Sequence, residues 1–321
     1  MKKTLRKILF GITLPQEYLC VPQNDFAKPL RVFAGDKPGK YGLDITTHHL
    51  FIGYKPLVIA VKKEYLNELK MSSQDPLYLS FRSEEKKELA SLKVKFIYEV
   101  NLNSVSCLLF EGVKGEHSFT SNFHKLFSSI YYRLTADKKK NIFLAGNLYD
   151  QVKIAYSIPR QIYLASVGSN SLYNIFPTDL SGQIGEDYFI ISLRTNGKAN
   201  EQVEKAGKCL VAKMEAGSFM EVYGAGRNHM REISDTNKLG VSLRQESSAA
   251  LNLPVPHDAI QYSELEKIDK FEVGIHTIHF FRIINSVSLS NSQSVLTHIH
   301  RDYAEWRIRN GISTNYLLRK Y

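Results

Sequence analysis

The sequence predicts a mainly β protein with some helix, built on antiparallel strands. Its second half holds five or six short runs with strand-like patterns, separated by only short helical segments. Strands joined in this way favour an antiparallel barrel or sandwich over a doubly wound parallel sheet. The composition, with 43% hydrophobic and 23% charged residues, excludes a disordered or collagen-like chain. No apolar run approaches the roughly 18–20 residues that a membrane-spanning helix needs.

The first half mixes short apolar runs with polar segments of helical character. Predicted strands cover residues 53–61, 77–81, 93–99 and 104–113, and predicted helical segments cover 64–70, 83–92 and 119–134. Residues 93–99 alternate between apolar and polar side chains, as a half-buried strand does. The segment 83–92 opens with Ser83 and two glutamates, which suit the N-terminus of a helix.

The second half begins after Pro159. Predicted strands cover residues 161–167, 173–180, 187–193, 208–213, 259–274 and 276–285. A short helix is expected over 198–207, because Gly207 is typical of the residue that ends a helix. A hairpin bend is expected near Gly274. The closing segment, residues 294–309, has helical spacing.

Short motifs recur in similar order and spacing in the two halves, and we call this similarity the internal echo. Strands 57–61 and 77–81 follow one another at about the spacing of strands 188–193 and 209–213. The order of Tyr98-Glu-Val100 and Leu108-Leu-Phe110 likewise resembles that of Phe271-Glu-Val273 and Phe280-Phe281. One hypothesis is a degenerate duplication, with two barrels packed as a pseudo-dimer within the chain. Chance similarity between two β-rich halves explains the echo equally well. The predicted domains are residues 1–154, a basic α+β unit without an assigned role, and residues 155–321.

The formal net charge is +10, and most of the excess lies in residues 1–150. A basic half suggests nucleic acid or an anionic membrane surface as a partner. The lysines are scattered, however, and the cluster at residues 138–140 fits a solvated loop or helix end. We therefore expect neither nucleic acid nor a membrane as the partner. A third interpretation stays open, in which the basic N-terminal half is a surface for nucleic acid or another anionic partner. We expect a cytoplasmic location, because the apolar run at the N-terminus stops at Pro15 without a cleavage site.

Three widely separated cysteines are expected to be reduced and buried. These cysteines are Cys20, Cys107 and Cys209.

The segment from Pro159 to Met214 carries most of the candidate chemistry. It has the order strand, polar turn, strand, basic turn, helix, strand. Arg194 and Lys198 lie just before a predicted helix N-terminus, where free N–H groups and flanking cations suit a phosphate. The alternative is that both cations are solvated charges at a strand end. Six further side chains of the segment offer hydrogen bonds: Ser166, Asn174, Thr178, Asp179, Ser181 and Ser192.

Several short motifs of this segment occur together in one family. They are Pro159-Arg-Gln-Ile-Tyr-Leu-Ala-Ser166, Asn174-Ile-Phe-Pro-Thr178, Ser192-Leu-Arg194, Lys198-Ala-Asn200, Cys209-Leu-Val-Ala212 and Gly274-Ile-His-Thr-Ile278. In this order the chain resembles the flavin reductase-like FMN-binding proteins over roughly residues 155–290. The resemblance implies an antiparallel, Greek-key split β-barrel in the C-terminal half.

The resemblance also implies the site residues. Asn174, Pro177 and Thr178 would line the flavin ring and ribityl chain, and the segment from Ser192 to Asn200 would hold the ribityl chain and phosphate. The chain departs from the family pattern at Ala199, which replaces a threonine, and at Ile275, which replaces an aspartate next to His276. The predicted cofactor-binding set is Ser166, Asn174, Pro177, Thr178, Ser192, Arg194, Lys198 and Asn200.

The function implied is that of an FMN-binding oxidoreductase of the flavin reductase type. It would pass electrons from NAD(P)H to flavin, or through bound FMN to another acceptor, with the flavin at a homodimer interface or at that of the intrachain pseudo-dimer. We nominate no catalytic side chain, because the isoalloxazine itself accepts and transfers the hydride. No metal site is predicted, because the paired histidines lack suitable spacing. The alternative is an FMN- or ligand-binding module without turnover, serving regulation or assembly.

Overall fold

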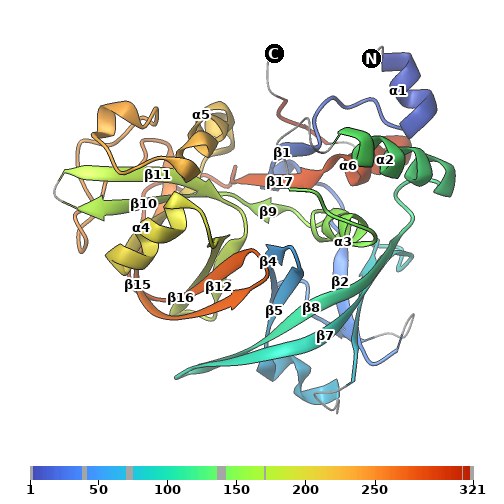
Figure 1. Ribbon diagram of the computed structural model, residues 1–321, viewed down its shortest axis with the longest axis horizontal. Helices are drawn as coiled ribbons and strands as arrows, with labels where there is room; N and C mark the ends of the chain where they lie inside the picture. Colours follow the sequence, from blue (N-terminus) through green and yellow to red (C-terminus); the bar gives the residue numbers. More distant parts are fainter. Residues whose placement is uncertain are drawn as a thin grey trace.

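The computed structural model describes residues 3–37, 42–69, 75–135, 142–169, 171–312 and 314–318, so the lysine cluster at 138–140 lies outside the described residues. The chain forms two seven-stranded antiparallel sheets and a smaller three-stranded sheet, with helices around them (Figure 1). The prediction of a mainly β, antiparallel protein is therefore confirmed. The three cysteines are buried and free, as expected.

The first large sheet is built from consecutive strands of the N-terminal half. Its strand order is β3-β2-β6-β7-β8-β5-β4. The strands are β2 (Arg31–Gly35), β3 (Leu43–Asp44), β4 (His49–Tyr54), β5 (Leu57–Lys62), β6 (Leu77–Arg82), β7 (Glu88–Leu102) and β8 (Val105–His117). A short 3₁₀ helix, η2 (Lys63–Leu69), connects β5 to β6.

The second large sheet uses strands of the C-terminal half in the order β11-β10-β14-β15-β16-β13-β12. The strands are β10 (Tyr163–Ser169), β11 (Leu172–Thr178), β12 (Ser181–Ile184), β13 (Tyr188–Arg194), β14 (Lys208–Met214), β15 (Ala259–Val273) and β16 (His276–Ser288). The helix α4 (Lys198–Ala206) connects β13 to β14 and ends at Gly207, which has φ of 63°. The β15–β16 hairpin bends at Gly274, as predicted.

The two sheets have the same topology. Numbered along the chain within each sheet, both sets of strands read second, first, fifth, sixth, seventh, fourth, third. The pair β5 and β6 corresponds to β13 and β14, and the hairpin β7–β8 corresponds to β15–β16, which are the pairs that the sequence echo links. A strand order of this complexity shared by both halves favours duplication over chance. Both sheets stay open, because their described edge strands do not pair with each other.

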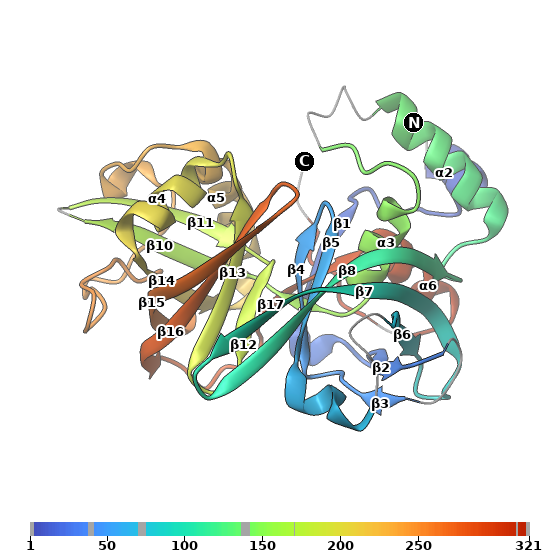
Figure 2. The ribbon, with the colours of Figure 1, turned by 60° about the horizontal axis from the view of Figure 1, so that its bottom comes forward.

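The sheets pack on each other through a shared apolar core and two long hairpins (Figure 2). The β15–β16 tip reaches the β4–β5 turn, where the Ile275 N–H donates to the Lys55 carbonyl at 3.1 Å. The β7–β8 tip reaches the β12–β13 turn on the opposite side. Between them, Tyr98 and Phe271 stack with ring centroids 4.3 Å apart. The buried core between the sheets contains Ile52, Val58, Ala60, Val100, Leu102, Cys107, Leu109, Ile184, Tyr188, Ile190, Ile278 and Phe280.

The chain ends are joined by the three-stranded sheet. Its central strand β17 (Leu296–His300) pairs with β1 (Tyr18–Pro22) and with β9 (Arg160–Gln161). Helices α1 (Lys3–Phe10), α2 (Asn122–Thr135), α3 (Leu148–Ala155) and α6 (Arg301–Arg309) gather at this end (Figure 1). Helix α5 (Phe219–Ala225) lies against the second sheet. Among the described residues, no helix has the length and apolar character needed to cross a bilayer.

The predicted helix over residues 83–92 is wrong. Residues 83–87 form a turn, in which the Ser83 N–H donates to the Lys87 carbonyl at 3.0 Å, and β7 then begins at Glu88. Strand β7 pairs with β6 on one side and β8 on the other, and it buries Leu89, Ala90 and Leu92. This burial between two neighbouring strands overrides the local preference for a helix.

The predicted helix over residues 294–309 is correct only in its second part. Residues 296–300 form β17, and α6 begins at Arg301. His300 is the N-cap, and its side chain accepts the N–H of Asp302 at 3.1 Å. Helical spacing and the two-residue spacing of a strand overlap in this short apolar stretch, so the pattern alone does not separate them.

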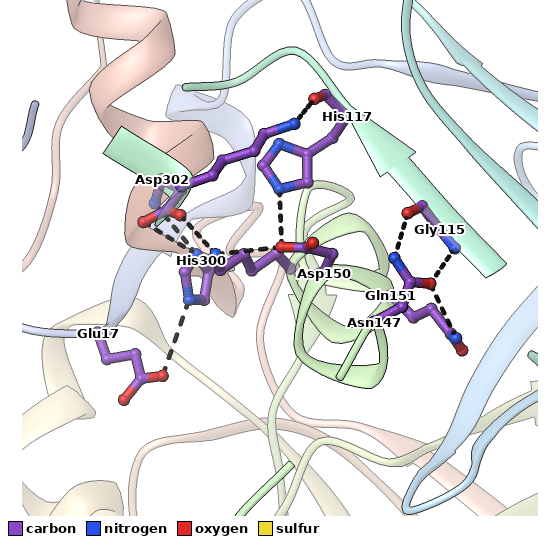
Figure 3. A network of polar contacts seen from close by, with 10 residues as sticks. Glu17, Gly115, His117, Asn147, Asp150, Gln151, His300 and Asp302 are labelled. Atoms are coloured by element: carbon purple, nitrogen blue, oxygen red, sulfur yellow. Dashed lines mark hydrogen bonds and ion pairs between the residues drawn. The ribbon is translucent and has the colours of Figure 1, made fainter. Parts of the chain in front are cut away.

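A buried polar network ties α3, α6 and β8 together (Figure 3). Lys153 lies 3.2 Å from Asp302 and 3.3 Å from Asp150, and Asp150 in turn lies 3.3 Å from His117. The two carboxylates raise the pKa of Lys153 despite its burial, which by itself lowers that pKa. Each buried charge in the network therefore has a partner, as stable burial requires.

Candidate functional site

A cavity of about 330 Å³ lies where the two large sheets meet. Most of its wall comes from the second sheet, namely the end of β11, the end of β13 and the first turn of α4, and Tyr54 of β4 completes it from the first sheet. The volume is at the lower end of the range typical for small-molecule sites. The lining residues are Tyr54, Pro177, Thr178, Asp179, Leu180, Ser192, Leu193, Arg194, Gly197, Ala199, Asn200, Gly226, His229, Met230 and His276.

His276 links the two sheets inside this cavity. The Tyr54 backbone N–H donates to His276 Nε2 at 3.2 Å, and the rings meet edge to face with centroids 4.6 Å apart. Because Nε2 accepts, the ring proton is on Nδ1, which faces Ser192 Oγ at 3.3 Å. Burial, with a smaller contribution from the Arg194 charge, lowers the pKa of His276 to about 4. The imidazole is therefore neutral at pH 7.

Arg194 supplies the positive charge of the cavity. It is the last residue of β13, and its Nε donates to the Tyr54 hydroxyl at 2.7 Å. The adjacent first turn of α4 contributes Gly197 and Ala199 to the wall. The Gly197 N–H donates to the Arg194 carbonyl at 2.9 Å, whereas the next N–H groups of the first turn have no acceptor within the helix. The corner combines a guanidinium with a helix N-terminus, which is an arrangement suited to an anion.

The structure brings five of the eight predicted residues to this cavity. Pro177, Thr178, Ser192, Arg194 and Asn200 line it. The Asn200 side chain also has a hydrogen-bond partner within the protein, because its Oδ1 accepts from His279 Nε2 at 2.7 Å.

The other three predicted residues are not among the lining residues. Lys198 pairs with Glu201 at 3.1 Å and with Glu232 at 2.8 Å. Asn174 is fully buried, and its Nδ2 donates to Gln202 and to the Asn228 carbonyl. Ser166 is fully buried within β10.

Sequence reasoning missed Tyr54 and His229 and left His276 without a role. Tyr54 belongs to the other half of the chain, and only the internal echo indicated that this half could reach the site. His229 lies in the 215–258 stretch, which matched nothing in the family pattern, and its Nε2 contacts the Pro177 carbonyl at 2.7 Å.

Asp179, at the edge of the cavity, forms a mostly buried ion pair with His298. Asp179 Oδ2 is 2.9 Å from His298 Nδ1 and accepts the Tyr156 hydroxyl at 2.9 Å. Hydrogen bonds and attraction from His298 outweigh burial and lower the pKa of Asp179 to about 2. Burial lowers the pKa of His298, but interactions with Asp179 and Cys20 outweigh it and raise that pKa to about 9. The Tyr223 hydroxyl contacts the other ring nitrogen of the histidine, His298 Nε2, at 2.7 Å.

A second cavity, of about 490 Å³, adjoins the first and shares Tyr54 and Arg194 with it. Tyrosine rings form much of its wall, and the hydroxyls of several are engaged within the protein, for example that of Tyr149 by Glu17 at 2.6 Å. Burial is the largest influence on Glu17 and raises its pKa, but contacts with His300 and Tyr149 outweigh it and lower the pKa to about 2. The lining tyrosines are Tyr18, Tyr54, Tyr132, Tyr149, Tyr156 and Tyr223.

The shared strand order places a set of matching positions on the other side of the junction. Matching the strand registers aligns Ser192 with Lys62, Arg194 with Glu64, His276 with Val105 and Tyr54 with Gly185. Lys62 and Glu64 form an ion pair with each other at 2.7 Å, and Lys62 also lies over the Tyr65 ring. The matching positions thus have neither the histidine–tyrosine contact nor an arginine.

Comparison with solved structures identifies proteins with related architecture at low sequence identity. An FMN-binding protein from Thermus thermophilus, with bound p-hydroxybenzaldehyde, is 14% identical, with a TM-score of 0.37; the match covers 44% of this chain and 87% of that one. The NADH:FAD oxidoreductase of Streptomyces globisporus C-1027 is 13% identical over 49% of this chain and 93% of that one, with a TM-score of 0.40. The flavin reductase PheA2 is 11% identical over 56% of this chain and 100% of its own, with a TM-score of 0.39. No protein-family model matches the sequence. No curated protein matches it either. The class that the structure itself defines is a protein of two open antiparallel sheets with the same strand order.

Proposed function

We propose that the chain is an FMN-binding oxidoreductase of the flavin reductase type, with FMN held in the cavity between the two sheets. The observation that carries this proposal is the anion corner of Arg194 and the α4 N-terminus at the end of a cavity that also presents hydrogen-bonding groups. FMN is a planar ring on a hydroxylated chain that ends in a dianionic phosphate. The residues present fit those parts.

Each part of the cavity has a role in this assignment. Arg194 and the N–H groups beside Gly197 would bind the phosphate. Thr178 and Ser192 would donate to the ribityl hydroxyls or ring carbonyls. Neutral His276 would keep the cavity wall in position through its hydrogen bond with Tyr54. When bound, the flavin supplies hydride acceptance and one- or two-electron transfer. The protein contributes binding, orientation and exclusion of water.

We assign the second substrate to the neighbouring tyrosine-lined cavity. It shares Tyr54 and Arg194 with the flavin cavity, so a molecule bound there lies beside the flavin. Tyrosine ring faces favour a flat aromatic partner through offset or edge-to-face contact. The nicotinamide of NAD(P)H, or a planar electron acceptor, has this shape.

Titration with FMN tests the cofactor assignment. Flavin fluorescence and thermal unfolding, measured with FMN and with riboflavin, should show binding that is tighter for FMN because only FMN carries the phosphate. The absence of binding to either flavin would remove the proposal. Equal affinity for both would remove the role of the Arg194 corner while leaving flavin binding in place.

A turnover measurement separates the enzyme from the alternative, a flavin-binding module without turnover. The loss of two family-pattern residues, at Ala199 and Ile275, favours that alternative. NADH or NADPH oxidation above the rate of free FMN supports the oxidoreductase. Filling the second cavity with Ile142→Trp should then raise KM for the nicotinamide and leave FMN affinity unchanged.

A further inference from the structure

The helices α1 and α2 pack side by side at one end of the molecule, away from the second sheet (Figures 1 and 2). Each helix exposes apolar side chains, and we call these side chains together the α1–α2 face. Its most exposed members are Leu134, at 71%, and Ile8, at 61%. The face consists of Leu5, Ile8, Phe123, Leu126, Ile130 and Leu134.

The arrangement of these residues is ordered. Phe123, Leu126, Ile130 and Leu134 follow one another at intervals of three and four, so they form a single stripe along α2. The protein already uses the other side of α2, where Tyr132 stacks on Tyr149 at 4.3 Å. Single exposed apolar residues are ordinary on a protein surface, but a continuous helical stripe indicates a binding surface.

The charged residues of the two helices themselves have one sign. Neither α1 nor α2 contains an acidic residue. Their basic residues are Lys3, Arg6, Lys7, Lys125 and Arg133. Lys125 is directed inward, to the His117 carbonyl, and Arg6 donates to the Pro15 carbonyl at 3.2 Å. Lys7 on α1 and Arg133 on α2 thus accompany the apolar stripe, and this combination is the pattern of a helix that lies in the interface of an anionic membrane.

We propose that the α1–α2 face binds the surface of an anionic phospholipid membrane. The apolar stripe enters the boundary between headgroups and acyl chains, and the flanking cations contact the anionic headgroups. A second copy of the chain fits the face less well, because a symmetric contact would bring two acid-free basic helices together. Nucleic acid would use the cations but not the apolar stripe. This inference is independent of FMN. It departs from the expectation of no membrane partner, which rested on the scattered lysines and on the lack of a spanning segment.

Vesicle flotation tests the proposal. The full chain is mixed with vesicles of phosphatidylcholine alone, or of phosphatidylcholine with phosphatidylglycerol, and the floating fraction is measured at low and high salt. We expect flotation with the anionic vesicles, reduced by salt. The double variant Leu126→Ser/Ile130→Ser should bind about tenfold more weakly or worse, because two apolar side chains no longer leave water. Lys7→Glu/Arg133→Glu should reduce binding to the anionic vesicles.

Ile268→Ser/Ile284→Ser is the matched control. Both residues are exposed apolar side chains on the β15–β16 hairpin, at 43% and 39%. This variant should float like the wild type, and circular dichroism should show that both double variants are folded. No flotation, equal flotation with both vesicle types, or wild-type flotation of Leu126→Ser/Ile130→Ser would overturn the proposal. A dimer that the same variant dissolves, without any vesicle binding, would assign the face to self-association instead.

Discussion

Tyr54 and His276 are 222 residues apart in the sequence, yet the Tyr54 N–H donates to His276 Nε2 at 3.2 Å across the junction of the two sheets. This contact has no equivalent on the other side of the junction, where Gly185 and Val105 hold the matching positions. The two halves share a strand order but not a binding site. Several expectations about ligand binding and stability derive from this asymmetry.

The first prediction concerns stoichiometry. We expect one FMN per chain rather than the two that a duplicated pair of barrels could hold. Lys62→Ser and Glu64→Ala alter the positions that match Ser192 and Arg194, and they should leave FMN affinity unchanged. Fluorescence titration at protein concentrations well above the dissociation constant measures the stoichiometry. A ratio of two, or a weakened FMN site in the Lys62 or Glu64 variants, contradicts the assignment.

The second prediction separates the two cations of the sequence motif. Arg194→Met should weaken FMN binding by about 10–100-fold, since a charge-assisted contact with phosphate contributes roughly 1.5–3 kcal/mol. Lys198→Met should change it by less than about threefold, because Lys198 is paired with Glu201 and Glu232 outside the cavity. Riboflavin is the control ligand, and Arg194→Met should affect its binding much less. The reverse ranking of the two variants would move the phosphate to Lys198.

The third prediction concerns acid pH. Burial lowers the pKa values of His49, His276 and His279 to about 4. In the unfolded chain these histidines titrate near 6.5, so between about pH 6.5 and pH 4 only the unfolded state takes up their protons. The free energy of unfolding should therefore be fully retained above about pH 6.5 and fall as the pH drops towards 4.

Urea unfolding at a series of pH values measures this dependence. His276→Asn should make it shallower, whereas His257→Asn should not, because His257 is exposed. An unchanged slope in the His276 variant would show that the histidine is protonated in the folded protein.

The fourth prediction concerns the buried pair of Asp179 and His298. Asp179→Asn leaves a buried imidazolium without its anion and should lower the free energy of unfolding by about 3 kcal/mol. Asp258→Asn is the matched control, because it breaks an exposed pair with His257 whose contribution is small. Because the pKa of His298 is raised, the contribution of the pair is present below about pH 6.5 and declines as the pH rises through 9. Equal destabilisation by the two variants would contradict the difference in burial.

The sequence predicted the β-rich architecture and most strands because alternation and short apolar runs are local signals. The internal echo predicted the duplication, since it paired β5 with β13 and the β7–β8 hairpin with β15–β16. The errors at residues 83–92 and 294–300 have a common cause. In both segments, pairing with strands distant in the sequence decides the structure, and a local window contains no trace of that pairing.

The candidate cavity was predictable only in part. Pro177, Thr178 and Arg194 lie in short motifs close together in the sequence. The contribution of Tyr54 depends on how the two halves pack, and the diversion of Lys198 depends on Glu232 in a segment that matched no pattern. Motif residues indicate the neighbourhood of a ligand, whereas distant acids and packing decide which cations remain available to it.

Covalent linkage of the two similar sheets has an evolutionary consequence. In a dimer of identical subunits every substitution appears twice, so a change that harms one pocket harms both. Here the position of Arg194 could be kept while its twin became Glu64, and Tyr54 could be kept while its twin became Gly185. In a single chain, one half can lose such residues while its sheet still supports the packing of the other.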